Sequence, residues 1–173
     1  MKKCKHCKVE FTPYHFNQKY CFKTECKDVW IEQEKSKQWK QTKKKWIAEN
    51  STLTKEVIKA QKIVNLYIRI RDKGKVCISC SKPPKKANAG HFWNANNHWS
   101  VRFDERNLNL QCEHCNNNLS GNLLYYRENL IKKIGLEEFN NLEQKAKTTA
   151  NFTINQVKKI AKYYQEKINA YKK

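Results

Sequence analysis

The eight cysteines of this chain fall into two separate sets of four, and these sets constrain the fold more than any other feature. The sets read Cys4-x2-Cys7-x13-Cys21-x4-Cys26 and Cys77-x2-Cys80-x31-Cys112-x2-Cys115. Each supplies the four thiolates of a closed tetrahedral zinc site, and a C-x2-C pair presents two sulfurs to one side of the metal. The spacing therefore predicts two structural Zn²⁺ ions per chain.

A disulfide framework is the alternative use of eight cysteines, and the surrounding sequence argues against it. Met1 is followed by a polar, basic stretch without the apolar centre of a secretory signal, and no apolar run approaches the length of a membrane span. We therefore expect a chain with reduced cysteines in the cytoplasm of a bacterial host cell, with no membrane partner.

The charge of the chain points to a polyanionic partner. Lysine and arginine number 36 against 16 acidic residues, a formal net charge of +20. Such an excess repels itself unless it meets an anion, so branched or duplex DNA is the leading partner and binding should weaken as salt rises. A membrane surface is a weaker alternative, because no segment joins a broad apolar face to the basic residues. With 39% hydrophobic residues, metal must share the stabilising role of the core.

The segments between the cysteines predict a small, zinc-stabilised α+β protein in four parts. Residues 1–27 form an N-terminal Cys4 zinc module, in which four aromatic rings are expected around the metal, those of Phe11, Tyr14, Phe16 and Tyr20. Residues 28–53 form a charged helical linker, because they contain neither proline nor glycine. Its Trp39 and Trp46 either rest on a neighbouring element or lie along phosphates. Residues 54–135 hold the second cysteine set, and residues 136–173 form C-terminal helices.

Local signals predict the elements of the second half. Thr54 is expected to cap a helix that runs to about Arg71, and residues 76–78 are expected to form a short strand. A second strand carries His91. Helices are expected over 123–134, closed by a glycine, and over 136–147. A capping box of Thr153 and Gln156 marks the start of the last helix.

Three polar residues are spaced around the second cysteine set in a pattern with chemical meaning. His91 follows Ala-Gly between the two C-x2-C pairs, Asn107 precedes Cys112 by five residues, and Asn116 directly follows Cys115. This arrangement resembles the HNH, or ββα-metal, nuclease motif. The resemblance implies that His91 is the general base, that Asn107 orients it, and that Asn116 binds a catalytic Mg²⁺ or Mn²⁺.

The residue types fit phosphodiester hydrolysis. A neutral imidazole can take a proton from the attacking water at physiological pH. A hard cation, for which an asparagine oxygen is a suitable ligand, offsets the charge that gathers on the phosphoryl oxygens. A zinc ion enclosed by four thiolates would hold the element rigid and take no part in the chemistry.

Longer stretches carry a closer resemblance. The pattern C-x2-C-x31-C-x2-C-Asn with an internal histidine is similar to phage endonuclease VII. The whole chain is similar to the phage NinG (Rap) recombination family, through CKHC, EFTP, NLYIRIRD, CISC, AGH, RFDERN and QCEHCNNNLSGN. That family implies cleavage of branched DNA, Holliday junctions in particular, during phage or prophage recombination. A homodimer would suit the two-fold symmetry of such a junction.

One position departs from the nuclease pattern. Most ββα-metal nucleases have an Asp or His metal ligand directly before the base, whereas this chain has Gly90. Asp104 is the first candidate to replace that ligand; His98, Asn118, Asn122, a backbone carbonyl and water are the alternatives. Because the glycine could mark a degenerate site, a non-catalytic DNA- or junction-binding accessory protein remains an alternative, and RNA binding is a third. Two tryptophans near the base, Trp93 and Trp99, are either core residues or wedges against unstacked bases.

Overall fold

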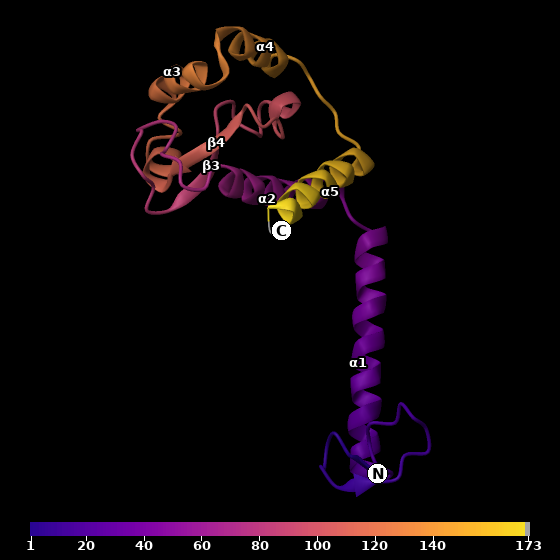
Figure 1. Ribbon diagram of the computed structural model, residues 1–173. Helices are drawn as coiled ribbons and strands as arrows, with labels where there is room; N and C mark the ends of the chain where they lie inside the picture. The colour runs from indigo at the N-terminus through magenta and orange to yellow at the C-terminus, as the bar shows by residue number, and fades with distance from the viewer. Residues whose placement is uncertain (172–173) are drawn as a thin grey trace. The chain divides into compact units, whose positions relative to one another are not determined.

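The computed structural model describes residues 1–171 and divides the chain into two compact units, Met1–Ser51 and Thr52–Lys173 (Figure 1). Each unit contains one set of four cysteines. Helices combine with two small two-stranded sheets, in agreement with the expected mixed class. In the described part of the chain, no helix is both long and apolar enough to cross a membrane.

The first unit joins a small antiparallel sheet to a long helix. Strand β1 (Lys2–Lys3) pairs with β2 (Glu10–Phe11), and helix α1 spans Thr24–Glu49. Cys26 lies in the first turn of α1, so the zinc module and the linker helix are continuous and the expected boundary at residue 27 falls inside the helix.

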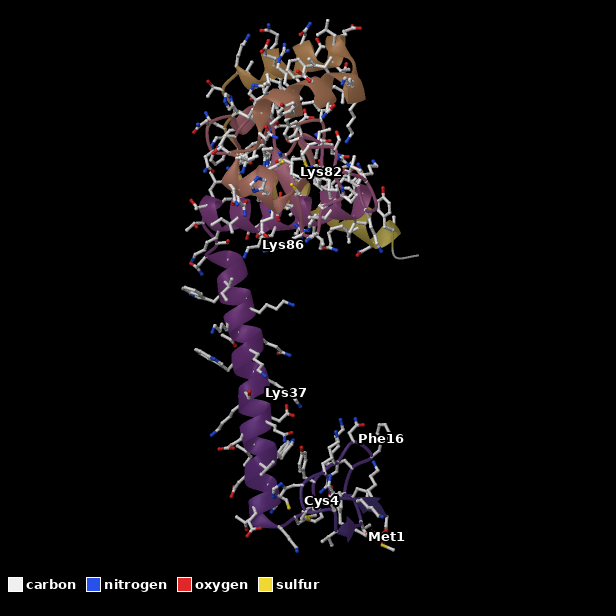
Figure 2. All side chains as sticks on the ribbon, turned by 90° about the vertical axis from the view of Figure 1, so that its left-hand side faces the viewer. Met1, Cys4, Phe16, Lys37, Lys82 and Lys86 are labelled. Atoms are coloured by element: carbon white, nitrogen blue, oxygen red, sulfur yellow. The ribbon has the colours of Figure 1, made fainter. Side chains whose placement is uncertain are left out.

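The aromatic packing expected around the first cysteine set is half correct. Phe11 and Tyr20 pack against the cysteines, but Tyr14 and Phe16 are 80% and 84% exposed. Phe16 is labelled in Figure 2. In the part of this unit whose burial is described, only three cysteines are buried, which is too small a core to cover four rings. Trp39 and Trp46 on α1 are also 67% and 62% exposed, so neither is covered by an element of its own unit.

The second unit is a β-hairpin covered by helices on both sides. Its elements are α2 (Leu53–Arg71), β3 (Ala87–His91), a 3₁₀ turn (Trp99–Val101), β4 (Leu108–Cys112), a π-helical turn (His114–Asn118), α3 (Leu123–Ile134), α4 (Leu136–Ala146) and α5 (Ile154–Ala170). Figure 1 shows the hairpin between α2 and α5 on one side and α3 on the other.

The two faces of the hairpin differ in chemistry because side chains alternate along a strand. Leu108 of β4 belongs to the main hydrophobic core, which α2 and α5 complete through residues such as Val64 and Ile168. Asn109 and Gln111 point to the opposite face, where they meet the α3 side. Tyr126 and Leu130 of α3 form a second core with Phe139 of α4. The hairpin thus has an apolar face and a polar, fully buried face.

Most expected elements of this unit are confirmed, with two corrections. The cap of α2 is Thr52, whose side chain accepts a hydrogen bond from the amide of Lys55, and not Thr54, which lies one residue inside the helix. Residues 76–78 form no strand. They lead into the cysteine turn instead, where the Cys77 amide bonds to the carbonyl of Lys82 and the Ile78 amide bonds to that of Leu110.

Candidate active site and metal centres

The first cysteine set is gathered into one cluster, with its four sulfurs within 4.8 Å of one another. The Cys4 turn closes through hydrogen bonds from the Cys4 amide to Val9 O and from the Lys8 amide to Cys4 O, with Lys8 at φ 63°. The sulfurs of Cys7 and Cys21 are 3.6 Å apart. Tetrahedral zinc with bonds of about 2.3 Å requires about 3.8 Å between sulfurs, so the cluster fits zinc.

The second cluster repeats this geometry. Its sulfurs also lie within 4.8 Å of one another, and those of Cys80 and Cys112 are 3.8 Å apart. The turn again closes through a bond from an amide to the first cysteine carbonyl, here from Ser81 at φ 56° to Cys77. All eight cysteines are free of disulfides. The two clusters are therefore compatible with two structural zinc ions, and the second one fastens the β4 end of the hairpin.

Amide donors to sulfur stabilise the thiolate form that zinc needs. In the first cluster the Cys21 amide donates to Cys4 Sγ at 3.3 Å, and in the second the Asn122 side chain donates to Cys115 Sγ at 3.7 Å. Although burial acts to raise the pKa of the Cys4 thiol, amide hydrogen bonds lower it to about 6. In the second cluster backbone hydrogen bonds likewise lower the pKa of the Cys77 thiol against the effect of burial, whereas burial and neighbouring thiols raise the pKa of Cys26 and of Cys115 to about 12. Each cluster therefore has a suitable donor set, in which the backbone favours the charged form of one sulfur.

His91 is the last residue of β3 and pairs with Leu108 of β4. Its Nε2 lies 3.1 Å from the carbonyl oxygen of Arg102 and 3.4 Å from Nε2 of Gln61 on α2. Because a carbonyl can only accept, we assign the ring proton to Nε2, which leaves a lone pair on Nδ1. Burial lowers the pKa of His91 to about 4, and the nearby charge of Arg102 acts in the same direction. The imidazole is therefore neutral at pH 7.

Asn107 is fully buried and does not contact His91 directly. Its Nδ2 donates to the carbonyls of Trp93 and Val101, and its Oδ1 accepts from the Trp93 amide. Its backbone carbonyl accepts from the Phe92 amide. The residue thus closes the loop that follows His91, and any effect on the histidine is transmitted through that backbone.

Asn116 lies in the π-helical turn after the second cysteine cluster and is half-buried. Its Nδ2 donates to Oδ1 of Asn117 at 2.7 Å. Among residues 1–171, no hydrogen bond joins Asn116 to His91 or occupies its Oδ1. The amide oxygen is therefore free to bind a hard cation.

Asp104 lies in a dense ion cluster. Arg106 Nη2 is 2.9 Å and Lys145 Nζ is 2.8 Å from Asp104 Oδ2, and Arg106 Nε donates to Oδ1 at 3.0 Å. Burial acts to raise the pKa of this carboxyl, but these donors hold it at about 2. A metal at Asp104 would have to displace both cations. The alternative ligand His98 has its Nδ1 3.0 Å from the carbonyl of Ala146, which leaves its Nε2 without a hydrogen-bond partner among the described residues.

Gly90 is buried in β3 beneath the side chain of Gln111. A Cβ at this position would lie 1.7 Å from Gln111 Oε1 and 2.5 Å from its Cδ. Gln111 is itself fixed, because its Nε2 donates to Ser79 Oγ at 2.7 Å and to Gly121 O at 2.6 Å. Glycine is therefore a packing requirement here, and no side chain could point to a metal from this position without moving Gln111.

The structure adds three residues to the candidate site that the sequence reasoning missed. Tyr126 of α3 donates to Gly90 O at 3.0 Å and accepts from Asn109 Nδ2 at 3.1 Å, so it fixes the strand beside His91. Gln61 and Arg102 border the imidazole. Arg102 stands in the quoted motif RFDERN and could have been singled out there, but Gln61 and Tyr126 carry no local signal.

The tryptophans near the base belong to the core. Trp93 packs at 5.4 Å between ring centroids against Phe139, and Trp99 packs at 6.1 Å against Phe152. Both are half-buried. Their rings are therefore already in contact with apolar partners, which disfavours a role as wedges between bases.

Comparison with known proteins places the chain in a family. All of it, residues 1–173, matches the family model described as Bacteriophage Lambda NinG protein. The chain belongs to the NinG family. Protein ninG of Escherichia phage 933W is 33% identical over 185 residues, which cover 96% of this chain and 92% of that protein. Protein ninG of Salmonella phage P22 is 39% identical over 110 residues, covering 63% of this chain and 54% of that protein. No solved structure matches the chain.

In this NinG family member, lysines border the second cysteine cluster. A basin beside Cys80 and Cys112 is lined by Lys82, Lys85 and Lys86. Figure 2 labels two of these lysines, Lys82 and Lys86. Lys86 is engaged with Glu113 at 2.5 Å. Lysines exposed next to a rigid metal centre are suited to contact with phosphates, which position a nucleic acid without reading its sequence.

Proposed function

We propose that this protein is a structure-specific, metal-dependent DNA endonuclease that cleaves branched DNA, of the Holliday junction or D-loop type, in phage or prophage recombination. The observation that carries the proposal is the position of His91 at the end of the hairpin, where the carbonyl of Arg102 holds its Nε2 and leaves Nδ1 without a hydrogen-bond partner among the described residues. The order of strands β3 and β4 followed by α3, with four cysteines at the base of the hairpin, supports the proposed resemblance to ββα-metal nucleases.

His91 is suited to act as general base. Its low pKa keeps the ring neutral at physiological pH, and the carbonyl of Arg102 holds the proton on Nε2. The Nδ1 lone pair can then accept a proton from water that attacks the phosphorus. Asn107 acts as a positioning residue, because its side chain joins the two ends of the loop that begins at His91.

Asn116 would hold the catalytic Mg²⁺ or Mn²⁺ through its free amide oxygen. When bound, the ion supplies charge stabilisation for the phosphoryl and leaving oxygens. Since Gly90 contributes no side chain and Asp104 is paired with two cations, water or a backbone carbonyl completes the ligand set more readily than Asp104 does.

The rest of the chain serves binding. A net charge of +20 and the lysines of α1 and of the basin at the second cluster suit a bent or branched polyanion. A two-fold homodimer would place two such sites for the opposed cuts that resolve a four-way junction.

A non-catalytic junction-binding accessory role is the second candidate. It is favoured by one observation, that the strand before His91 offers no carboxylate while the nearest alternative, Asp104, is neutralised by Arg106 and Lys145. In that role His91 would be a buried core histidine.

Cleavage of a labelled four-way junction tests the proposal. The zinc-loaded protein is incubated with the junction or with linear duplexes of the same sequence, with and without added Mg²⁺. In the control reaction Mg²⁺ is omitted, and no chelator is added, because a chelator would also strip zinc from the cysteine clusters. We expect Mg²⁺-dependent cuts near the branch point of the junction and not in the duplexes. Tight junction binding without cuts in either Mg²⁺ or Mn²⁺ would favour the accessory role.

A further inference from the structure

Arg102 is a buried cation without a carboxylate partner. The residue is 8% exposed, and among residues 1–171 no carboxylate oxygen lies within 4.0 Å of its guanidinium. Two other partly buried arginines differ from it. Arg71 pairs with Asp72 and Glu105, and Arg106 pairs with Asp104 and Glu138. Since an unpaired charge is costly to bury, Arg102 requires an explanation that the other two do not.

Neutral groups fix the guanidinium in place. Nη1 donates to the carbonyl of Ala95 at 3.0 Å and to the side chain of Asn96 at 3.5 Å. The guanidinium carbon lies 5.4 Å from the ring centre of Trp99 and 5.8 Å from that of Phe103. Nε is buried and has no hydrogen-bond partner among the described residues. These contacts orient the guanidinium but supply no negative charge. The cation therefore has no counter-ion among the described residues.

The position of Arg102 ties it to His91. Its backbone carbonyl accepts the hydrogen bond from His91 Nε2, and its charge is close enough to act on the imidazole. The same Nε2 lies 3.4 Å from Nε2 of Gln61, whose Oε1 is likewise buried and unpaired. The Nη2 of this fixed cation makes no hydrogen bond with the described residues and is not buried, so it has the chemistry to bind a phosphate oxygen.

We propose that Arg102 forms an anion site beside His91 that takes the phosphate group of a DNA backbone, in which the phosphate supplies the counter-charge that the guanidinium lacks. The identity of the anion as the scissile phosphate rests on the proposed nuclease function, whereas binding of phosphate does not. The site would orient the phosphodiester beside the base and stabilise the charge that develops on its oxygens.

Inorganic phosphate is the probe. The full-length, zinc-loaded protein is titrated with phosphate at constant ionic strength, and the ring resonances of His91 are followed by NMR. We expect a saturable shift that sodium chloride does not produce. Arg102→Met should abolish it, and Arg102→Lys should weaken binding by about tenfold or more, because lysine keeps the charge and loses the fixed planar donors.

The matched control is Arg127→Met. Arg127 also has an aromatic neighbour, with its guanidinium 5.0 Å from the Phe139 ring centre, but it is exposed. Its loss removes the same charge and should leave the phosphate response of His91 unchanged. Equal losses in the two methionine variants, or no saturable shift in the wild type, would overturn the anion site.

Stability and cleavage separate the remaining outcomes. In phosphate-free buffer, Arg102→Met should unfold at the wild-type temperature or above, because an unpaired buried charge is replaced by an apolar side chain of similar length. If Arg102→Met unfolded at a clearly lower temperature than the wild type, and Arg102→Lys bound phosphate as well as the wild type, Arg102 would have a structural role and the proposal would be refuted. Phosphate binding without junction cleavage would leave the anion site standing and remove the nuclease function. If Arg102→Met cleaved and bound the junction like the wild type, the nuclease function would stand and the role of Arg102 in holding a DNA phosphate would be refuted.

Discussion

Replacing Gly90 tests whether this position is a lost metal ligand or a packing requirement. In Gly90→Ala the new Cβ would lie 1.7 Å from Oε1, 2.5 Å from Cδ and 2.9 Å from Cγ of Gln111, so this side chain must move. Moving it breaks the buried hydrogen bonds from Nε2 to Ser79 and Gly121. Two such bonds, with a buried group left unpaired, amount to about 3 kcal/mol in the free energy of unfolding.

A double-mutant cycle makes the test specific. Gln111→Ala alone loses the same two bonds and should also cost about 3 kcal/mol. Because the three atoms nearest to the new Cβ in Gly90→Ala all belong to Gln111, the double variant should cost about 3 kcal/mol and not about 6, a coupling of about 3 kcal/mol. Urea denaturation of the zinc-loaded proteins, followed by circular dichroism, measures these values. Additive losses would show that Gln111 is not the obstacle and would refute the packing account of Gly90.

Three further predictions concern the metals, the charge and the pH dependence. Elemental analysis of the purified protein should give two zinc ions per chain, and one or none would contradict the assignment of one or both cysteine clusters. Replacing Lys43, Lys44 and Lys45 by glutamine should lower the slope of log Kd for junction DNA against log salt by up to about 2.7, at about 0.9 per phosphate contact; an unchanged slope would mean that α1 does not contact phosphates. The pKa of His91 is lowered from 6.5 to about 4 in the folded state, so the unfolded state binds the proton first as the pH falls. Stability should therefore decrease from about pH 6.5 to pH 4, by up to about 3 kcal/mol, and His91→Gln should remove this part of the decrease; identical pH profiles for the two proteins would contradict it.

Local patterns predicted much of the fold from the sequence. Cysteine spacing predicted both clusters because a C-x2-C turn is a short-range structure whose two sulfurs meet whatever surrounds them. The capping box of Thr153 and Gln156 was likewise confirmed, with both reciprocal hydrogen bonds in place at the start of α5. The strand expected at 76–78 was wrong, because a short apolar run before a cysteine turn has the same pattern as a buried strand.

The candidate site depends on contacts that no local pattern reports. Asp104 was a natural choice for a metal ligand, but it is paired with Arg106, two residues away, and with Lys145, 41 residues away, and only the first partner lies within the local motif. Position 90 requires glycine because the side chain of Gln111 on the facing strand occupies the space of a Cβ. Arg102 draws attention because it is buried and no carboxylate pairs with it among the described residues. Each of these is a property of tertiary packing, so a sequence can nominate the residues but not their partners.

Single-turnover cleavage by His91→Ala tests the central claim most directly. Wild-type and variant proteins are each mixed in excess with a labelled four-way junction and Mg²⁺, and binding is measured on the same samples by fluorescence anisotropy. Since His91 is proposed to act on the attacking water and not to hold the DNA, the variant should bind the junction within about twofold of the wild type and cleave it at least about a hundredfold more slowly. Cleavage by His91→Ala at the wild-type rate would contradict the account.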